Sequence, residues 1–393
     1  MINIQLKKRA AKRARSGYPL IQAEDIQSSP TKWQTGEWVT FYDASQQYVG
    51  TGYLGKQNKG MGWIISRDQT ARLNRAFFER LFQQAFEKRQ AFFADDLTTA
   101  FRIFNGEGDG LGGLTIDWYD GYLLLTWYND SLYQMKPLLL EACQAVLKDI
   151  QGIYEKNRFD LQGLPESQHI AGAKAPEPLI VKENGVSFAT YLDDGMMTGI
   201  FLDQKEVRGR LVNGLMAGGR VLNTFSYTGA FSVAAAMGGA IETTSVDLAK
   251  RSREKTTEMF EVNQLALTTH NIVVMDIFDY IRYAKRHALT FDMVILDPPG
   301  FARNKKRTFS VQQDYDQLVA DIVPLIEKKG YLIASTNVAS LSYERFKEMV
   351  ETGLATSHRA YRLVATHRLP EDFAVHPHFE EGNYLKVLLY ELD

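Results

Sequence analysis

The segment at residues 221–247 constrains the fold of this chain most strongly. It reads VLNTFSYTGAFSVAAAMGGAIETTSVD: a short apolar run, a turn of small and hydroxyl residues, an alanine-rich stretch and a second short run that ends in an acid. A strand, a helix and a second strand in this order form one β-α-β unit, which joins two parallel strands. The segment therefore predicts an α/β fold.

The turn of this unit predicts a ligand site. It consists of Phe225, Ser226, Tyr227, Thr228 and Gly229. Small and hydroxyl residues after a strand let a ligand approach the backbone at the open N-terminus of a helix. Asp247 is predicted to end the next strand, where an acid can bind the two hydroxyls of a ribose. Its spacing from Gly229 is close to the roughly 20 residues expected between such a turn and its ribose acid.

The composition of the turn narrows the choice of nucleoside. Only Gly229 stands in it, and the dinucleotide fingerprint G-x-G-x-x-G is absent. A pyrophosphate would need the missing glycines. A cofactor with a ribose but no phosphate, such as S-adenosylmethionine, fits better. An α/β core without a ligand is the alternative, because such turns also serve packing alone.

The whole chain sets further limits. Its 393 residues exceed one average domain, and a formal net charge of −2 excludes a uniformly basic nucleic-acid binder but not local basic patches. The single cysteine, Cys143, excludes a disulfide framework and favours a reducing compartment. No apolar run has the length of a membrane span, and the basic start lacks the apolar core of a signal peptide. We expect a cytoplasmic protein without membrane contact.

The N-terminal part combines a basic start with an aromatic, glycine-rich segment. Residues 1–16 contain six cations and no acid: Lys7, Lys8, Arg9, Lys12, Arg13 and Arg15. This density predicts an arm that contacts RNA phosphates, and a solvated helix face is an equal alternative. Short alternating runs between glycines at residues 33–65 predict a small β-barrel.

The middle of the chain gives a mixed helix and strand pattern. The glycine-rich run at residues 105–117 has three acids but lacks EF-hand spacing, so a tight structural loop is favoured over a metal loop, and no metal site is predicted. The turn Glu183-Asn184-Gly185 predicts a hairpin within residues 182–201. The remaining predictions are helices at about 70–90 and 135–150, strands at 122–128 and 152–155, and a loop or small insertion at 160–178.

Strand and helix patterns alternate from Gly219 to the end, which predicts a doubly wound parallel sheet. The predicted strands are 221–224, 244–246, 271–274, 293–296, 331–334 and 384–390. Ligands bind at the carboxyl ends of strands in such sheets, so the loops at those ends are the candidate site.

Two of these loops complete the candidate site. Asp276 can accept a hydrogen bond from an adenine amine, and the neighbouring Ile277 can cover the ring. Asp297 and Pro298 begin the sequence Asp-Pro-Pro-Gly-Phe after an apolar strand; its carboxylate and rigid carbonyls can receive a flipped base, and Phe301 can stack on it. The basic run that follows suits a phosphate backbone, through Arg303, Lys305, Lys306 and Arg307.

Several motifs, in this order and spacing, make the chain resemble a known family. These are Ser16-Gly17-Tyr18-Pro19, Gly106-Glu107-Gly108-Asp109, Thr198-Gly199-Ile200-Phe201-Leu202-Asp203-Gln204, Asn223 to Phe231, Ser245-Val246-Asp247 and Asp297 to Phe301. The chain resembles class I S-adenosylmethionine-dependent methyltransferases of large-subunit rRNA with an N-terminal PUA domain.

The resemblance implies a PUA-like RNA-binding domain at 1–70, a central α/β domain at 71–185 and a Rossmann-like methyltransferase domain at 186–393. It also implies cofactor contacts by Asp203, Gln204, the turn at 225–229, Asp247 and Asp276. The implied partner is RNA, as 23S rRNA or a large-subunit particle, and the sequence leaves a homodimer open.

One departure from the family pattern affects the chemistry. The best-known members methylate cytosine at C5 through a cysteine thiolate, and this sequence has Asn337 where that cysteine belongs. Cys143 lies in the central domain and is a poor substitute. Nitrogen methylation needs no covalent intermediate, and related guanine-modifying rRNA enzymes also lack the cysteine.

We therefore expect N-methylation of a purine, slightly ahead of cytosine C5-methylation, with Asp297, Pro298, Phe301 and Asn337 holding the base. Two rivals remain. A non-catalytic, RNA-binding ribosome-assembly factor is disfavoured by the intact turn and Asp247, and a nicotinamide-dependent oxidoreductase by the absent glycines.

Overall fold

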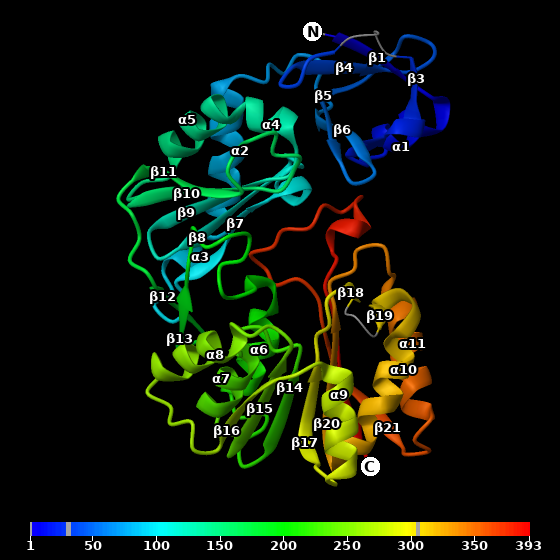
Figure 1. Ribbon diagram of the computed structural model, residues 1–393. Helices are drawn as coiled ribbons and strands as arrows, with labels where there is room; N and C mark the ends of the chain where they lie inside the picture. The colour runs from blue at the N-terminus through cyan, green and yellow to red at the C-terminus, as the bar shows by residue number, and fades with distance from the viewer. Residues whose placement is uncertain (1, 29–32, 304–306) are drawn as a thin grey trace. The chain divides into compact units, whose positions relative to one another are not determined.

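The computed structural model describes residues 2–28, 33–303 and 307–393, which form two compact units (Figure 1). The first unit contains Met1–Leu179, Tyr191–Thr198 and Glu371–Gly382. The second contains Ile180–Thr190, Gly199–Pro370 and Asn383–Asp393. Neither unit is one continuous stretch of chain, and the three-domain division at residues 70 and 185 stays a prediction.

The first unit begins with a small β domain built on one sheet of six described strands, in the order β2-β6-β5-β4-β1-β3. The elements are β1 (Ile2–Leu6), α1 (Lys8–Arg15), β2 (Leu20–Gln22), β3 (Ile26–Ser28), β4 (Trp38–Tyr42), β5 (Tyr48–Gln57) and β6 (Gly60–Ser66). β5 and β6 approach so closely that a Cβ on Gly52 would lie 1.7 Å from the carbonyl oxygen of Trp63. The glycine-rich segment is thus required by close strand packing.

The basic start is a strand and a helix of this domain. β1 pairs with β3 and β4, and α1 buries Ala10, Ala11 and Ala14 in the same hydrophobic cluster as Phe41. The cations of α1 occupy the positions between these alanines. Residues 8–15 are therefore a helix of this domain, and contact of its exposed cations with RNA phosphates stays a prediction.

The rest of the first unit is a sheet of five described strands, in the order β11-β10-β9-β8-β7, packed on helices. Its elements are α2 (Arg75–Glu87), α3 (Gln90–Phe93), β7 (Ala100–Asn105), β8 (Leu114–Tyr119), β9 (Tyr122–Trp127), α4 (Asp130–Gln134), α5 (Lys136–Val146), β10 (Gly152–Asn157) and β11 (Ser167–Gly172). The predicted helices α2 and α5 are confirmed. The predicted loop at 160–178 is wrong in part, because polar, partly exposed β11 pairs with β10 as an edge strand.

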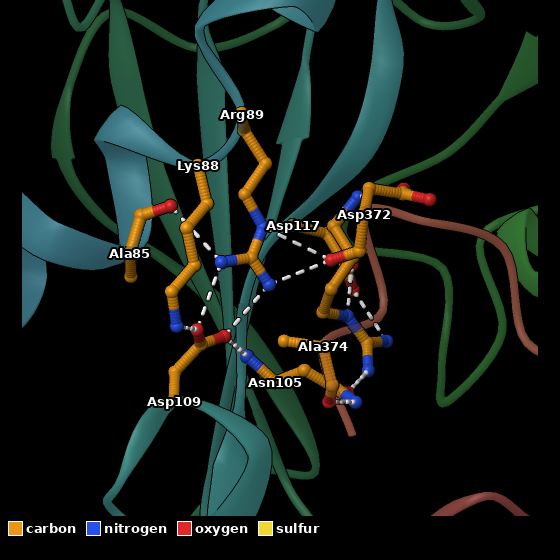
Figure 2. A network of polar contacts seen from close by, with 9 residues as sticks. Ala85, Lys88, Arg89, Asn105, Asp109, Asp117, Asp372 and Ala374 are labelled. Atoms are coloured by element: carbon orange, nitrogen blue, oxygen red, sulfur yellow. Dashed lines mark hydrogen bonds and ion pairs between the residues drawn. The ribbon is translucent and has the colours of Figure 1, made fainter. Parts of the chain in front are cut away.

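A buried ion pair anchors residues 371–382 in the first unit (Figure 2). The guanidinium of Arg89, 1% exposed, donates to both carboxylate oxygens of Asp109, at 2.8 and 2.7 Å. The same guanidinium donates twice to the carbonyl oxygen of Asp372, at 3.0 and 2.7 Å. The segment between two strands of the second unit is thereby fixed to the first.

The glycine-rich loop is part of this anchor. Its 3-10 turn, Gly106–Asp109, carries the buried carboxylate of Asp109, and a Cβ on Gly108 would lie 1.8 Å from the carbonyl oxygen of Ala374. Asn105 donates to that same oxygen at 2.9 Å (Figure 2). The prediction of a tight structural loop is confirmed.

The second unit is built on a sheet of seven described strands, in the order β16-β15-β14-β17-β20-β22-β21. Its strands are β14 (Arg220–Thr224), β15 (Glu242–Asp247), β16 (His270–Val274), β17 (Phe291–Leu296), β20 (Ile326–Thr336), β21 (Tyr361–His367) and β22 (Lys386–Leu392). Its helices are α6 (Lys205–Val212), α7 (Ala230–Met237), α8 (Ser252–Glu261), α9 (Ile277–Arg286), α10 (Val311–Ile322) and α11 (Tyr343–Ala355).

Alternate residues of each strand pack against helices on opposite faces of this sheet. Met293 and Ile295 of β17 join the cluster of α6 and α7, and Val294 and Leu296 join that of α9, α10 and α11. Both clusters are apolar, which explains why the central strands read as continuous apolar runs. The doubly wound sheet is confirmed, with helices on both faces (Figure 1).

Three features of the second unit differ from the prediction. β22 pairs antiparallel with β20, and β21 pairs antiparallel with β22, so the sheet is mixed rather than parallel throughout. A short hairpin, β18 (Phe301–Arg303) with β19 (Thr308–Ser310), follows the Asp-Pro-Pro-Gly sequence. The hairpin predicted within 182–201 is β12 (Leu179–Glu183) with β13 (Val186–Thr190), and it ends at residue 190.

Candidate active site

The turn after β14 is strained where the sequence predicts a ligand. Phe225 and Tyr227 have φ of 52° each, and Gly229 has φ of 77°. Left-handed backbone at bulky residues costs free energy and concentrates at functional sites. A Cβ on Gly229 would lie 2.5 Å from Cγ2 of Thr256, so this position accepts glycine alone without a shift of its neighbour.

Asp247 holds this turn in place from the end of β15. Its Oδ2 accepts the backbone N–H of Tyr227 at 2.9 Å, and its Oδ1 accepts that of Ala249 at 2.8 Å. Ser226 donates its backbone N–H to Val246, at 3.0 Å. The turn and the predicted ribose acid are thus one hydrogen-bonded structure at the carboxyl edge of the sheet.

The segment 199–204 lies against the same turn. The hydroxyl of Thr228 donates to the carbonyl oxygen of Gly199 at 2.7 Å, and the rings of Phe201 and Tyr227 have centroids 5.4 Å apart. Asp203 accepts a hydrogen bond from the Tyr384 hydroxyl at 2.9 Å. The structure therefore brings the predicted cofactor residues before and within the turn together.

Gln204 links this cofactor side to Asp297, which follows β17. Its Nε2 donates to Oγ of Ser335 at 2.8 Å and approaches Oδ1 of Asp297 at 3.4 Å. Among the described residues, no donor reaches the buried Oε1 of Gln204. A buried acceptor of this kind calls for a partner outside the chain.

Among the carboxyl groups at this edge of the sheet, that of Asp297 has the most strongly shifted pKa. Part of the residue is exposed, but its carboxylate is enclosed by protein atoms, and this burial raises the pKa of Asp297 to about 6. The nearby charge of Asp203 also raises it, and a hydrogen bond from Ser335 acts against the shift. Pro298, next to it, is buried.

Asp276 follows β16 and caps a helix. Its Oδ1 accepts the backbone N–H groups of Phe278 at 3.0 Å and Asp279 at 3.3 Å, at the start of α9, and Ile277 is buried. The role of Asp276 and Ile277 toward an adenine stays a prediction, beside this capping role.

The hairpin after Pro298 presents the predicted stacking ring and basic residues. Phe301 is 62% exposed and Arg303 is exposed. Arg307 is exposed too, and its guanidinium lies 4.2 Å from the ring centroid of Phe278. Lys305 and Lys306 lie outside the described residues.

The predicted RNA contacts of α1 divide into two groups. Lys7, Lys8, Arg9 and Lys12 are exposed. Arg13 pairs with Asp25 at 2.5 Å, and its guanidinium lies 4.5 Å from the ring centroid of Tyr18. Arg13 thus has a structural role within the domain.

The residue that replaces the family's nucleophile and the single cysteine of the chain differ sharply in setting. Asn337 is exposed directly after β20, the strand that pairs with β17. Cys143 is fully buried in the hydrophobic cluster of the first unit, and this burial raises the pKa of its thiol to about 12. In the described part of the chain, no three His, Cys, Asp or Glu side chains come together as metal ligands, and no helix is long and apolar enough to span a membrane.

Sequence reasoning missed Ser335, Tyr384 and Lys386. Ser335 and Tyr384 bind predicted site residues, and Lys386 lies in register with Thr336 at the end of β20. For Tyr384 and Lys386 a signal existed only in the pairing of the strands: β22 runs antiparallel to β20, so its start lies beside the end of β20. Ser335 is on β20 itself, one residue beyond the predicted strand.

Comparison with known proteins identifies the family of the chain. Residues 4–67 match the PUA-like domain family, and residues 101–390 match the S-adenosylmethionine-dependent methyltransferases. YwbD of Bacillus subtilis (strain 168), named as a candidate ribosomal RNA large subunit methyltransferase, is 44% identical over 391 residues, 99% of each chain. A ribosomal RNA large subunit methyltransferase of Deinococcus radiodurans is 29% identical over 402 residues, 100% of this chain and 98% of that one.

A solved structure extends the likeness to the fold. SMU.776, a candidate methyltransferase complexed with SAH, has a TM-score of 0.93 at 44% identity, over 100% of both chains. The predicted fold class, enzyme class and cofactor are confirmed. The chain therefore belongs to the family of S-adenosylmethionine-dependent methyltransferases and carries a PUA-like domain in its N-terminal part.

Proposed function

We propose that this enzyme methylates a nitrogen of a purine base in large-subunit rRNA. The choice of atom rests on two observations: Asn337 stands where the family has its cysteine, and the single cysteine, Cys143, is buried. Methylation of cytosine at C5 needs a thiolate to add to C6, and a thiol enclosed in the first unit's core supplies none at neutral pH.

The residues present fit the cofactor. The glycine at 229 keeps the turn open, Asp247 offers a carboxylate for ribose hydroxyls, and the unpartnered Oε1 of Gln204 offers a buried acceptor. When bound, S-adenosylmethionine supplies an electrophilic methyl group on its sulfonium. Asp203, Gln204, the turn at 225–229, Asp247, Asp276 and Ile277 are proposed to hold it.

The acceptor side is proposed to orient the base. Above pH 6 the carboxylate of Asp297 is ionised and can accept N–H groups of the base, while the Pro298 carbonyl and exposed Phe301 hold its edge and face. Asn337 has both a donor and an acceptor for the same base. A nitrogen lone pair aligned with the methyl group needs no covalent intermediate with the protein, and where that nitrogen bears a hydrogen, the carboxylate of Asp297 can accept the released proton.

RNA as the substrate is supported by the names of the relatives and by the charge pattern. YwbD and the Deinococcus radiodurans relative are both named for ribosomal RNA of the large subunit. We propose that phosphates are contacted by the four exposed cations within residues 7–12 and by Arg303 and Arg307 on the β18–β19 hairpin. A role for Lys305 and Lys306 stays a prediction.

The test compares rRNA nucleosides by mass spectrometry from cells with and without the protein. We expect one N-methylated purine to be absent without the protein and restored by the wild-type chain. Loss of 5-methylcytidine instead would establish the cytosine alternative, and unchanged nucleosides would contradict the proposal.

A further inference from the structure

Lys386 is a buried cation at the acceptor edge of the sheet. It begins β22, opposite Thr336 at the end of β20, and is 2% exposed. In the described parts of the chain no carboxylate forms an ion pair with it. Burial, with the positive charge of Arg368, lowers the pKa of Lys386 to about 8. Enclosing an ammonium without a counter-ion costs free energy, so this position calls for a compensating role.

The ammonium of Lys386 binds two backbone segments that flank the site. Its Nζ donates to the carbonyl oxygen of Val338 at 2.8 Å and to that of Tyr384 at 2.7 Å. Val338 directly follows Asn337, and Tyr384 donates its hydroxyl to Asp203. One side chain thus ties the residue after Asn337 to the residue that holds Asp203.

Val338 also contacts the turn that carries Asp297. A Cβ on Gly300 would lie 2.9 Å from Cγ2 of Val338, so the two residues are packed closely. The carbonyl of Val338 accepts the backbone N–H of Leu341 at 3.1 Å as well. Displacement of this carbonyl would therefore move the Asn337 turn against the Asp297 turn.

We propose that Lys386 is a positioning residue for methyl transfer, which fixes Asn337 toward the acceptor base by binding the carbonyls of Val338 and Tyr384. The inference rests on the proposed role of Asn337. It assigns Lys386 no contact with cofactor or RNA. Its effect is on turnover, through the geometry of the acceptor side.

A double-mutant cycle tests this role. Lys386→Met, Asn337→Ala and the double variant are compared for kcat on rRNA from cells that lack the protein, and for cofactor affinity by calorimetry. We expect Lys386→Met to lower kcat about tenfold, with the Kd for S-adenosylmethionine changed less than about twofold. In the Asn337→Ala background the same change should lower kcat less than about twofold, because residues that act through one another are not additive.

Losses that simply multiply in the double variant, or an unchanged kcat in Lys386→Met, would overturn the proposal. If wild-type enzyme transfers no methyl group to RNA, the proposed function fails first; a normal wild type with an additive cycle contradicts the role of Lys386 alone. Lys386→Gln keeps a donor for one carbonyl and replaces Lys386→Met if that variant fails to bind cofactor.

Lys156→Met is the matched control. Lys156 is 1% exposed, belongs to the first unit, and donates to the backbone carbonyl of Gly195. Burial also lowers the pKa of Lys156 to about 8. Its replacement removes an equally buried ammonium and should leave kcat unchanged. An equal loss of kcat in both variants would assign the effect to stability and contradict the proposal.

Discussion

Two aspartates on either side of β14 differ because their surroundings differ. Asp247 accepts two backbone N–H groups at the end of β15, so its carboxylate is held in a fixed orientation. Asp297, after β17, is enclosed, which raises its pKa to about 6. The fixed carboxylate of Asp247 suits hydrogen bonds from ribose hydroxyls. The enclosed carboxylate of Asp297 suits hydrogen bonds from a nucleobase within the site.

Asp247→Ala should weaken cofactor binding while RNA binding persists. Hydrogen bonds to charged groups contribute about 1.5–3 kcal/mol each, so we expect the Kd for S-adenosylmethionine to rise about tenfold or more, measured by calorimetry. Asp247→Asn is the matched control: it keeps an acceptor for the Tyr227 N–H and should lose less. Unaltered affinity in Asp247→Ala would remove this residue from the cofactor site.

Asp297 should make turnover depend on pH on the acidic side of the pH–rate profile. Its pKa is raised from an ordinary 3.8 to about 6, so the folded protein binds more protons than the unfolded chain between these values, and this carboxylate's contribution to stability falls as pH rises through that interval. Turnover needs the ionised form and should fall below about pH 6. Asp297→Asn should bind cofactor normally and lose turnover. A pH-independent kcat from pH 5 to 7 would contradict the assignment.

At the scale of elements, segments far apart in sequence share one structure. The anchor of Figure 2 joins α2 and α3 to the segment between β21 and β22 through Arg89, Asp109 and Asp372. Sequence periodicity predicted α2, but it gave no sign that a C-terminal segment packs on the Gly106–Asp109 turn. Hydrogen bonds between residues 283 apart in the chain leave no local pattern.

Asp109→Ala should destabilise the protein strongly. It leaves the guanidinium of Arg89 buried without its carboxylate, and breaking such a pair costs roughly 3–5 kcal/mol. Thermal and urea denaturation measure the loss. Glu348→Ala, which breaks the exposed pair with Arg345, should cost about 1 kcal/mol or less. Equal effects of the two variants would contradict the structural role of the glycine-rich loop.

The α1 cations should act as an electrostatic group. Replacing Lys7, Lys8 and Arg9 by glutamine should weaken RNA binding and lower the slope of log K against log salt by about 0.7–0.9 for each phosphate that is no longer neutralised. Lys328 and Lys329 are exposed within β20 and provide a control pair. An unchanged salt slope in the α1 variant would return these residues to a solvated helix face.

At the scale of the whole molecule, the parallel strands of the second unit's sheet were predictable from the sequence. The strand β21 and the antiparallel direction of β22 were not. Apolar runs and the turn at 225–229 are local signals, so the parallel strands and the cofactor edge were predictable. Strand periodicity did not reveal these two features, because strand direction depends on tertiary pairing. Tyr384 and Lys386 reach the site through that pairing, which explains why they were missed. Ser335 lies on β20, one residue beyond the predicted strand 331–334.

The central claim is methyl transfer to a purine nitrogen without a cysteine nucleophile. Its most direct test is a transfer assay with methyl-labelled S-adenosylmethionine and rRNA from cells lacking the protein, in which wild type and Cys143→Ser are compared and the labelled nucleoside is identified. We expect equal rates and label in an N-methylated purine. Label in 5-methylcytidine, together with loss of transfer in Cys143→Ser, would contradict it.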